Sequence, residues 1–147
     1  MSRTGGKRSA GAFLRQVADE LPSMLPPSHR EYSAEHWGRC FKIWYGEKGL
    51  HFEVQFLRNG RLEIAFHMES DQKTNESVNA DLEAAQTRIR RALGDDPEFF
   101  AHGPRWRALR EVWSGGDLRS EEAAVEAAAR LAAYVTAIRP LLPARAS

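Results

Sequence analysis

Residues 40–69 contain three successive runs in which apolar and polar side chains alternate, and this pattern limits the fold more than any other feature of the chain. Alternation with a period of two is typical of β-strands that bury one face. The runs are separated by Gly46-Glu47-Lys48-Gly49 and Arg58-Asn59-Gly60, both typical turn sequences. The pattern therefore predicts a three-stranded antiparallel meander.

The second turn determines how its two strands pair. A two-residue loop would pair Phe56 with Glu63 and place the apolar side chains of the two strands on opposite faces of the sheet. A three-residue loop, 58–60, with Gly60 in the left-handed region as a G1 bulge, pairs Phe56 with Leu62 instead. We expect the second arrangement, because it gathers the apolar side chains on one face.

By the same reasoning, the first turn is a four-residue loop, 46–49, that pairs Tyr45 with Leu50. The apolar side chains of all three strands then share the core face: Phe41, Ile43, Tyr45, Leu50, Phe52, Val54, Phe56, Leu62, Ile64, Phe66 and Met68. The opposite face is polar. Its first row is Trp44, His51 and His67, with Glu69 diagonal to His51 and Glu53 diagonal to His67.

Helices are expected on both sides of the meander in the sequence. Apolar residues at helical spacing predict a helix over 12–21 that Pro22 ends, and another over 75–93 that Gly94 ends. A long final helix is expected to begin after Ser120 and to end at Pro140.

Two further segments are less regular. Residues 31–38 are expected to add a helical turn. Residues 98–113 fit either a helix after Pro104 or one or two strands, and we favour strand because the segment is short and a strong turn sequence, 114–117, follows it.

The expected fold class is α+β: a three-stranded antiparallel meander, extended to four or five strands if 98–113 is strand, with two or three helices packed on one face as a two-layer sandwich. Residues 1–11 are expected to form a disordered basic tail, and residues 12–147 a single domain. This order of elements resembles the small α+β sandwich of secretion-chaperone-like domains. The resemblance lies in topology alone, and no sequence motif accompanies it.

Composition excludes several classes of protein. The formal net charge is +1, so the chain as a whole has no strong field that would attract nucleic acid or an anionic membrane. The single cysteine, Cys40, excludes an internal disulfide. We find no secretory signal pattern and no apolar run long enough to span a bilayer, so a cytoplasmic location without membrane contact is expected. P-loop, dinucleotide-binding, G-x-S-x-G and H-E-x-x-H motifs are also missing from the sequence.

The polar face of the meander carries the residues best suited to chemistry. His51 and His67 are expected to face each other, with Glu53 and Glu69 beside them. Two imidazoles with flanking carboxylates suit a zinc or iron site, or general acid–base catalysis. The simpler interpretation is an ordinary solvated sheet face, which carries residues of these types. No cofactor is expected otherwise.

Trp44 is unusual on a polar face, since a large aromatic side chain there suggests coverage by a partner or by another part of this chain, such as the N-terminal segment. We therefore favour a non-catalytic, chaperone- or adaptor-like interaction module that binds a protein partner or a second copy of itself. Its contact residues would be Trp44, His51, His67, Glu53 and Glu69, together with an exposed end of the final helix (Tyr134, Leu141 and Leu142). A metal-dependent or acid–base enzyme that uses the histidine face is the alternative.

Arginines and aromatic residues between 88 and 110 provide a second alternative, nucleic-acid association. The candidate contacts are Arg88, Arg91, Arg105 and Arg107. Residues 86–113 hold six arginines and four carboxylates, and this small excess argues against nucleic acid as a partner because binders normally show a stronger basic footprint.

Overall fold

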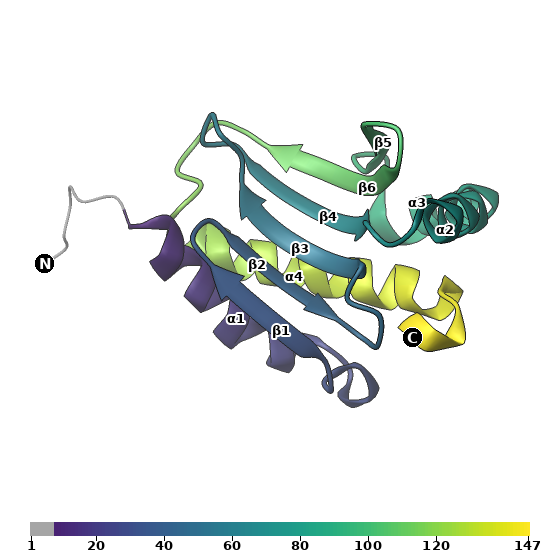
Figure 1. The fold of residues 1–147 in the computed structure, drawn as a ribbon. Coiled ribbons are helices and arrows are strands. Elements are labelled where there is room, and N and C mark those ends of the chain that lie inside the picture. The colour runs from purple at the N-terminus through teal and green to yellow at the C-terminus, as the bar shows by residue number, and fades with distance from the viewer. Residues whose placement is uncertain (1–7) are drawn as a thin grey trace, which may run out of the picture.

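The computed structural model describes residues 8–147 and shows an α+β fold with a six-stranded antiparallel sheet (Figure 1). In sheet order the strands are β1 Ser33–Trp37, β2 Cys40–Trp44, β3 Leu50–Phe56, β4 Leu62–Met68, β6 Trp106–Trp113 and β5 Glu98–His102. The expected fold class is confirmed, but the sheet has more strands than the three to five that were expected.

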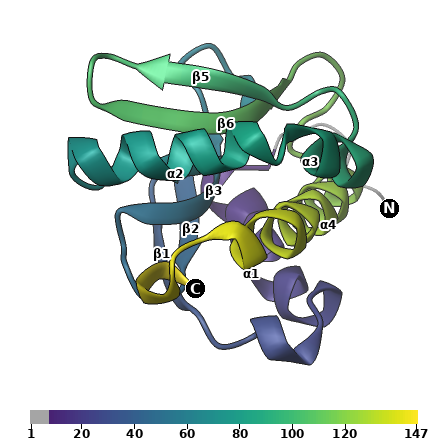
Figure 2. The ribbon, with the colours of Figure 1, turned by 90° about the vertical axis from the view of Figure 1, so that its right-hand side faces the viewer.

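Two of the helices form the second layer. α1 (Ala10–Met24) and α4 (Glu121–Ile138) pack against each other and cover the same face of the meander (Figures 1 and 2). α2 (Gln72–Ala84) and α3 (Gln86–Leu93) follow β4 and lie at one end of the sheet, where α2 contacts β6. Within residues 8–147, no helix covers the opposite face of the sheet.

The register of the meander is confirmed. Phe56 pairs with Leu62, and the Leu57 amide donates to the Arg61 carbonyl over 2.8 Å, which leaves a three-residue loop. Gly60 has φ 84°, as the G1 bulge requires. All eleven side chains assigned to the core face are buried. The alternation in the sequence was therefore sufficient to set both faces of these three strands.

β1 corrects the helical turn that was expected over 31–38. Ser33–Trp37 forms an edge strand paired with β2, and a two-residue loop at Gly38 and Arg39 joins the two strands. Gly38 has φ 52°, which suits the first position of a type II′ hairpin turn. Helix-compatible residues such as Ala34 and Glu35 therefore adopt the extended form because β2 offers a pairing partner.

α1 is longer than expected at both ends. It begins at Ala10, where Ser9 caps it, so the last residues of the expected 1–11 tail belong to the helix, and residues 1–7 lie outside the described residues. It also continues through Pro22 to Met24. Proline removes only one hydrogen bond this close to a helix end. Burial of Leu25, just beyond the last turn, helps to hold the segment against the core.

The remaining segments agree in part. The helix expected over 75–93 is two helices that meet at Ala85, and the first begins early because the Asp71 carboxylate caps it. Residues 98–113 are two strands, as favoured. α4 has no exposed end of the expected kind: Tyr134 is fully buried and Leu142 is 8% exposed, so neither offers a contact surface. No helix of the described residues is long and apolar enough to cross a membrane.

Candidate metal centre

The polar face of the sheet is buried at its centre. His51 and His67 are each 2% exposed, and Glu63 is fully buried. The His67 ring lies between the rings of His51 and His102, with centroid distances of 5.4 and 5.3 Å. The interpretation of these residues as an ordinary solvated face is therefore wrong. They are shielded because side chains on this face, including His102 from β5, pack against one another.

His51 is oriented by a backbone carbonyl. Its Nδ1 atom lies 3.0 Å from the carbonyl oxygen of Lys48. Because a carbonyl oxygen only accepts hydrogen bonds, Nδ1 must carry the ring proton in this contact. The other nitrogen, Nε2, faces two carboxylates: Glu53 Oε1 at 2.9 Å and Glu69 Oε1 at 4.0 Å.

His67 is oriented by a carboxylate. Its Nε2 atom lies 2.9 Å from Glu63 Oε1, and its Nδ1 atom lies 3.0 Å from Glu69 Oε2. Glu63 is itself fixed, since Gln55 Nε2 donates to it over 2.7 Å and Arg110 Nη1 over 2.9 Å. The ring of His67 is thus held between a rigid carboxylate and a partly exposed one.

The protonation of these groups follows from the same contacts. Burial alone would lower the pKa of His67, but hydrogen bonds to Glu63 and Glu69 raise it to about 10. Burial alone would raise the pKa of Glu63, but the hydrogen bond and charge of His67, with Gln55 and Arg110, lower it to about 2. In the protein without metal, the His67 ring is therefore a cation between two anions.

Charge at this place is not balanced by fixed cations. Three carboxylates, Glu53, Glu63 and Glu69, lie around the two histidines. Among residues 8–147, Arg110 is the only arginine or lysine that forms an ion pair with any of the three. Buried carboxylates need compensating charge. Either a proton on His67 or a bound cation can supply it.

Three residues of this cluster, His51, His67 and Glu69, offer ligand atoms that all lie within 4.8 Å of one another. Glu53 adjoins this group, with its Oε1 atom 2.9 Å from His51 Nε2. Neighbouring ligands at ~2.1 Å from a metal lie roughly 3.0 to 3.4 Å apart in octahedral or tetrahedral geometry. The structure thus brings together all four residues that the sequence singled out.

A second group, Glu63, His67 and His102, also has ligand atoms within 4.8 Å of one another. It shares His67 with the first group, and its carboxylate already accepts from Gln55 and Arg110. His102 Nε2 is buried without a hydrogen-bond partner. Burial, and then the charge of His67, lower the pKa of His102, so its ring is neutral. Because Glu63 is already held by Gln55 and Arg110, we place His102 beside the centre rather than in it.

Trp44 and Cys40 lie on the same face of the sheet as the cluster. Trp44 is half-buried, with Lys48 Nζ 5.2 Å from its ring centroid, so part of its cover comes from this chain itself. Cys40 is buried, and this burial, followed by the charge of Glu53, raises the pKa of its thiol.

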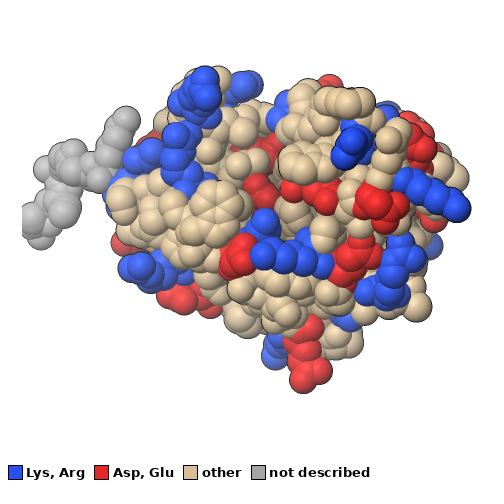
Figure 3. Space-filling view, in the orientation of Figure 1, with Lys and Arg blue, Asp and Glu red and all other residues tan. Residues whose placement is uncertain are grey.

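The four arginines do not form one surface. Asn75 in the first turn of α2 donates to the Arg105 carbonyl, so Arg105 and Arg107 lie at the start of that helix. Arg88 and Arg91 lie on α3, beyond the far end of α2, roughly 20 Å away for a helix of 13 residues. On the face seen in Figure 3, basic side chains are interspersed with acidic ones rather than joined in a band.

Sequence reasoning did not find Glu63, Gln55, Arg110 or His102 as parts of the site. Glu63 and His67 stand four positions apart on one strand face, and this spacing was the only available signal. Arg110 and His102 come from strands whose place in the sheet the sequence did not reveal. No protein-family model, curated protein or solved structure that was compared with this chain matches it.

Proposed function

We propose that the protein binds one divalent transition-metal ion through His51 Nε2, His67 Nδ1, Glu53 and Glu69. The proposal rests on one observation: in both histidines the nitrogen that faces away from the centre is already bonded to an acceptor. Lys48 O holds Nδ1 of His51, and Glu63 holds Nε2 of His67. Histidines that ligate metals almost always donate their other N–H to a backbone carbonyl or a carboxylate.

The donor set indicates which ions suit the centre. Two imidazole nitrogens and two carboxylates fit zinc, iron(II) or manganese(II), whereas copper(I) prefers sulfur ligands. Two carboxylate ligands also neutralise the charge of a divalent ion. The ion would thus supply the positive charge that the three carboxylates need, in place of the proton on His67.

Access to the centre comes from one side. The side chains of His51 and His67 are 2% exposed and that of Glu53 is 8% exposed, but that of Glu69 is 24% exposed. A water molecule or a small ligand would therefore reach the ion past Glu69. A water molecule activated by the metal, or an acid–base reaction, would therefore act on the open side of the centre beside Glu69. This agrees with the enzyme alternative that the sequence suggested.

Metal analysis of the purified protein tests the proposal. Protein prepared without chelators is analysed for zinc, iron and manganese, stripped, and titrated with each ion by calorimetry. We expect one equivalent to bind to the wild type and to His36→Ala, which removes an exposed histidine from β1. We expect no comparable binding to the double variant His51→Ala/His67→Ala.

A milder variant guards against misfolding. Glu69 is partly exposed, so Glu69→Gln should keep the fold, as circular dichroism would show, and still weaken binding. The proposal fails if the wild type binds none of the three ions. It also fails if Glu69→Gln and the double histidine variant bind like the wild type.

The interaction module favoured from the sequence is the second proposal, and Trp37 is the observation that favours it. Trp37 is 57% exposed at the end of edge strand β1. His51, His67 and Glu53 are buried, so a partner would meet the edge of the sheet rather than this part of its face.

A further inference from the structure

We propose that a second copy of this chain pairs with the protein through β1, antiparallel, with Glu35 facing Glu35 of the partner subunit. The two sheets then form one continuous sheet. This inference is independent of the metal centre, because β1 contributes none of the proposed ligands.

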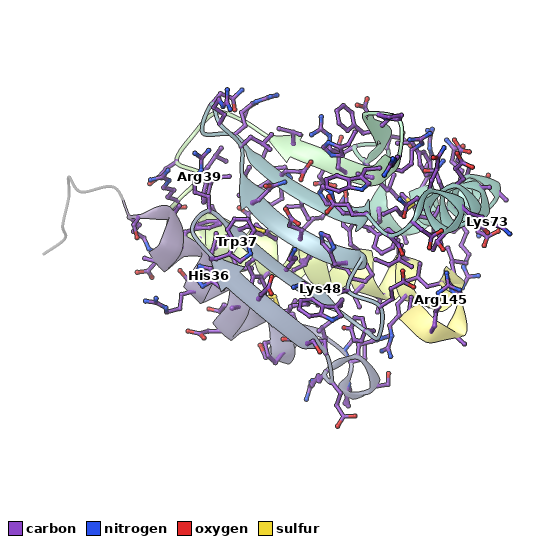
Figure 4. The ribbon with its side chains drawn as sticks, viewed as in Figure 1. His36, Trp37, Arg39, Lys48, Lys73 and Arg145 are labelled. Carbon is purple, nitrogen blue, oxygen red and sulfur yellow. The ribbon has the colours of Figure 1, made fainter. Side chains whose placement is uncertain are left out.

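Within residues 8–147, β1 pairs only with β2, and no other strand lies against its outer edge. Ser33 and Trp37 on one face, and Ala34 and His36 on the other, are all exposed. Figure 4 shows His36 and Trp37 near the end of the β1–β2 hairpin, beside Arg39. An exposed edge strand is a template for pairing with another strand.

The turn after β1 determines which backbone groups point outward. Trp37 and Cys40 close the two-residue loop, so they form a hydrogen-bonded pair, as residues i and i+3 of a β-turn do. Hydrogen-bonded and non-hydrogen-bonded pairs alternate along an antiparallel ladder. Ser33, Glu35 and Trp37 therefore bond to β2. The N–H and C=O groups of Ala34 and His36 point away from the sheet.

These outward groups are self-complementary. With a two-fold axis at Glu35, Ala34 lies opposite His36 of the partner subunit, and the symmetric pair lies on the other side of the axis. Both are then hydrogen-bonded pairs, each of which forms two N–H···O bonds. This register uses every outward group of the two residues in both copies.

The side chains fit the same register. Trp37 would lie opposite Ser33 of the partner subunit, whose small side chain leaves space above the sheet. Ser33 pairs with Trp44 on β2, so the two tryptophans would meet on one face. The symmetry repeats this contact. Half-buried Trp44 and exposed Trp37 would thus cover each other above the small Ser33 side chain, and this contact would remove apolar surface of both from water.

Charge at the two-fold axis is compensated. Two Glu35 carboxylates would face each other, but Glu35 lies 2.7 Å from Lys48 Nζ and 3.9 Å from Lys42 Nζ. Four ammonium groups would therefore surround the two carboxylates. Figure 3 shows acidic and basic side chains mixed on the face that includes β1, so neither sign of charge dominates where two copies would meet.

Sedimentation equilibrium over a concentration series that reaches the millimolar range tests the proposal. We expect a reversible monomer–dimer equilibrium for the wild type. Ala34→Pro removes an outward N–H and leaves the ladder with β2 intact, so it should abolish the dimer without unfolding the protein. Trp37→Ala should weaken the dimer, and Trp106→Ala, which removes a tryptophan that is 46% exposed on β6, should not.

A cysteine at the two-fold axis tests the register. Glu35 and its symmetry mate would form a non-hydrogen-bonded pair with Cα atoms about 4.5 Å apart, a distance that a disulfide spans. Glu35→Cys should therefore form a covalent dimer under mild oxidation. Ser33→Cys should not, and Cys40 is buried in both proteins.

Three results would overturn the proposal: a wild type that is monomeric throughout the series, a dimer that survives Ala34→Pro, or a Glu35→Cys variant that stays monomeric on oxidation. If the wild type were monomeric, the outer edge of β1 would instead be a pairing site for an extended segment of another protein. None of these results bears on metal binding, so the two proposals fail separately.

Discussion

Glu63 shows how a residue can matter to a centre that it does not touch. It is fully buried, and three side chains donate to it: His67, Gln55 and Arg110. A carboxylate held in this way fixes the orientation of the His67 ring and presents Nδ1 toward Glu69. Its role in the proposed centre is therefore positioning.

Glu63→Gln tests this role. The amide can still contact His67, but it carries no charge to support a neutral, metal-bound imidazole. We expect the affinity for the preferred ion to fall by roughly 10- to 100-fold, as is usual when the partner of a ligating histidine is replaced. Competition against a chelator measures the change.

Glu126→Gln is the matched control, since Glu126 is an exposed carboxylate on α4, in the helical layer away from the cluster. Its affinity should equal that of the wild type. An unchanged affinity in a folded Glu63→Gln protein would contradict the positioning role.

At the scale of single residues, the sequence predicted half of the residues that meet in the buried histidine–carboxylate cluster. His51 and His67 face each other because alternation and one bulge fix the register, and both signals are local. Glu63, Arg110 and His102 were missed for different reasons. Arg110 reaches Glu63 across 47 positions, and that contact depends on β6 lying beside β4, which no local pattern encodes.

At the scale of elements, substitutions at two uncrowded glycines, Gly60 and Gly11, would show how backbone conformation affects stability without a change in packing. Gly60 has φ 84° in the β3–β4 loop, and a Cβ added there would meet nothing within 4 Å. Gly11 lies in α1, and a Cβ there would meet only Ser9 Oγ at 3.9 Å. Neither site is crowded, so any change in stability comes from the backbone.

The same substitution should therefore have opposite effects. Gly60→Ala forces alanine into the left-handed region, and we expect the free energy of unfolding to fall by about 1 to 2 kcal/mol. Gly11→Ala should raise it by about 0.5 to 1 kcal/mol, because alanine loses less chain entropy in a helix. Chemical denaturation of the two variants measures both effects. A neutral Gly60→Ala would contradict the bulge.

β1 explains the main error in predicting elements. Its five residues contain no long alternation, and Ala34, Glu35 and His36 tolerate a helix as well as a strand. The strand exists because β2 lies next to it and Gly38 permits a tight turn. Such tertiary pairing is absent from any local window of the sequence, whereas the meander was predictable because each of its runs carries its own pattern.

At the scale of the whole molecule, two buried tyrosines should limit stability at high pH. Burial raises the pKa of Tyr134 and of Tyr45 well above the ordinary value of 10.0. The unfolded chain then releases these protons near pH 10, while the folded protein keeps them. Each tyrosine therefore contributes stability that is complete below about pH 10 and is lost as the pH rises above it.

We expect the free energy of unfolding to fall above about pH 10 by up to about 1.4 kcal/mol per pH unit for each tyrosine. Tyr134→Phe should have a shallower fall in this range, although it also loses the 2.9 Å hydrogen bond to Glu111 and so starts from a lower value. Urea denaturation between pH 8 and about pH 11 measures both curves. Parallel curves would contradict the buried phenol.

The packing of α1 against α4 has a consequence for synthesis in the cell. α1 is synthesised well before α4, yet each covers part of the other's apolar surface. While the chain grows on a ribosome, only α1 is present to cover the apolar face of the meander. Folding must then wait for the final helix to emerge, and until that moment the nascent chain offers a hydrophobic surface to chaperones or to its neighbours.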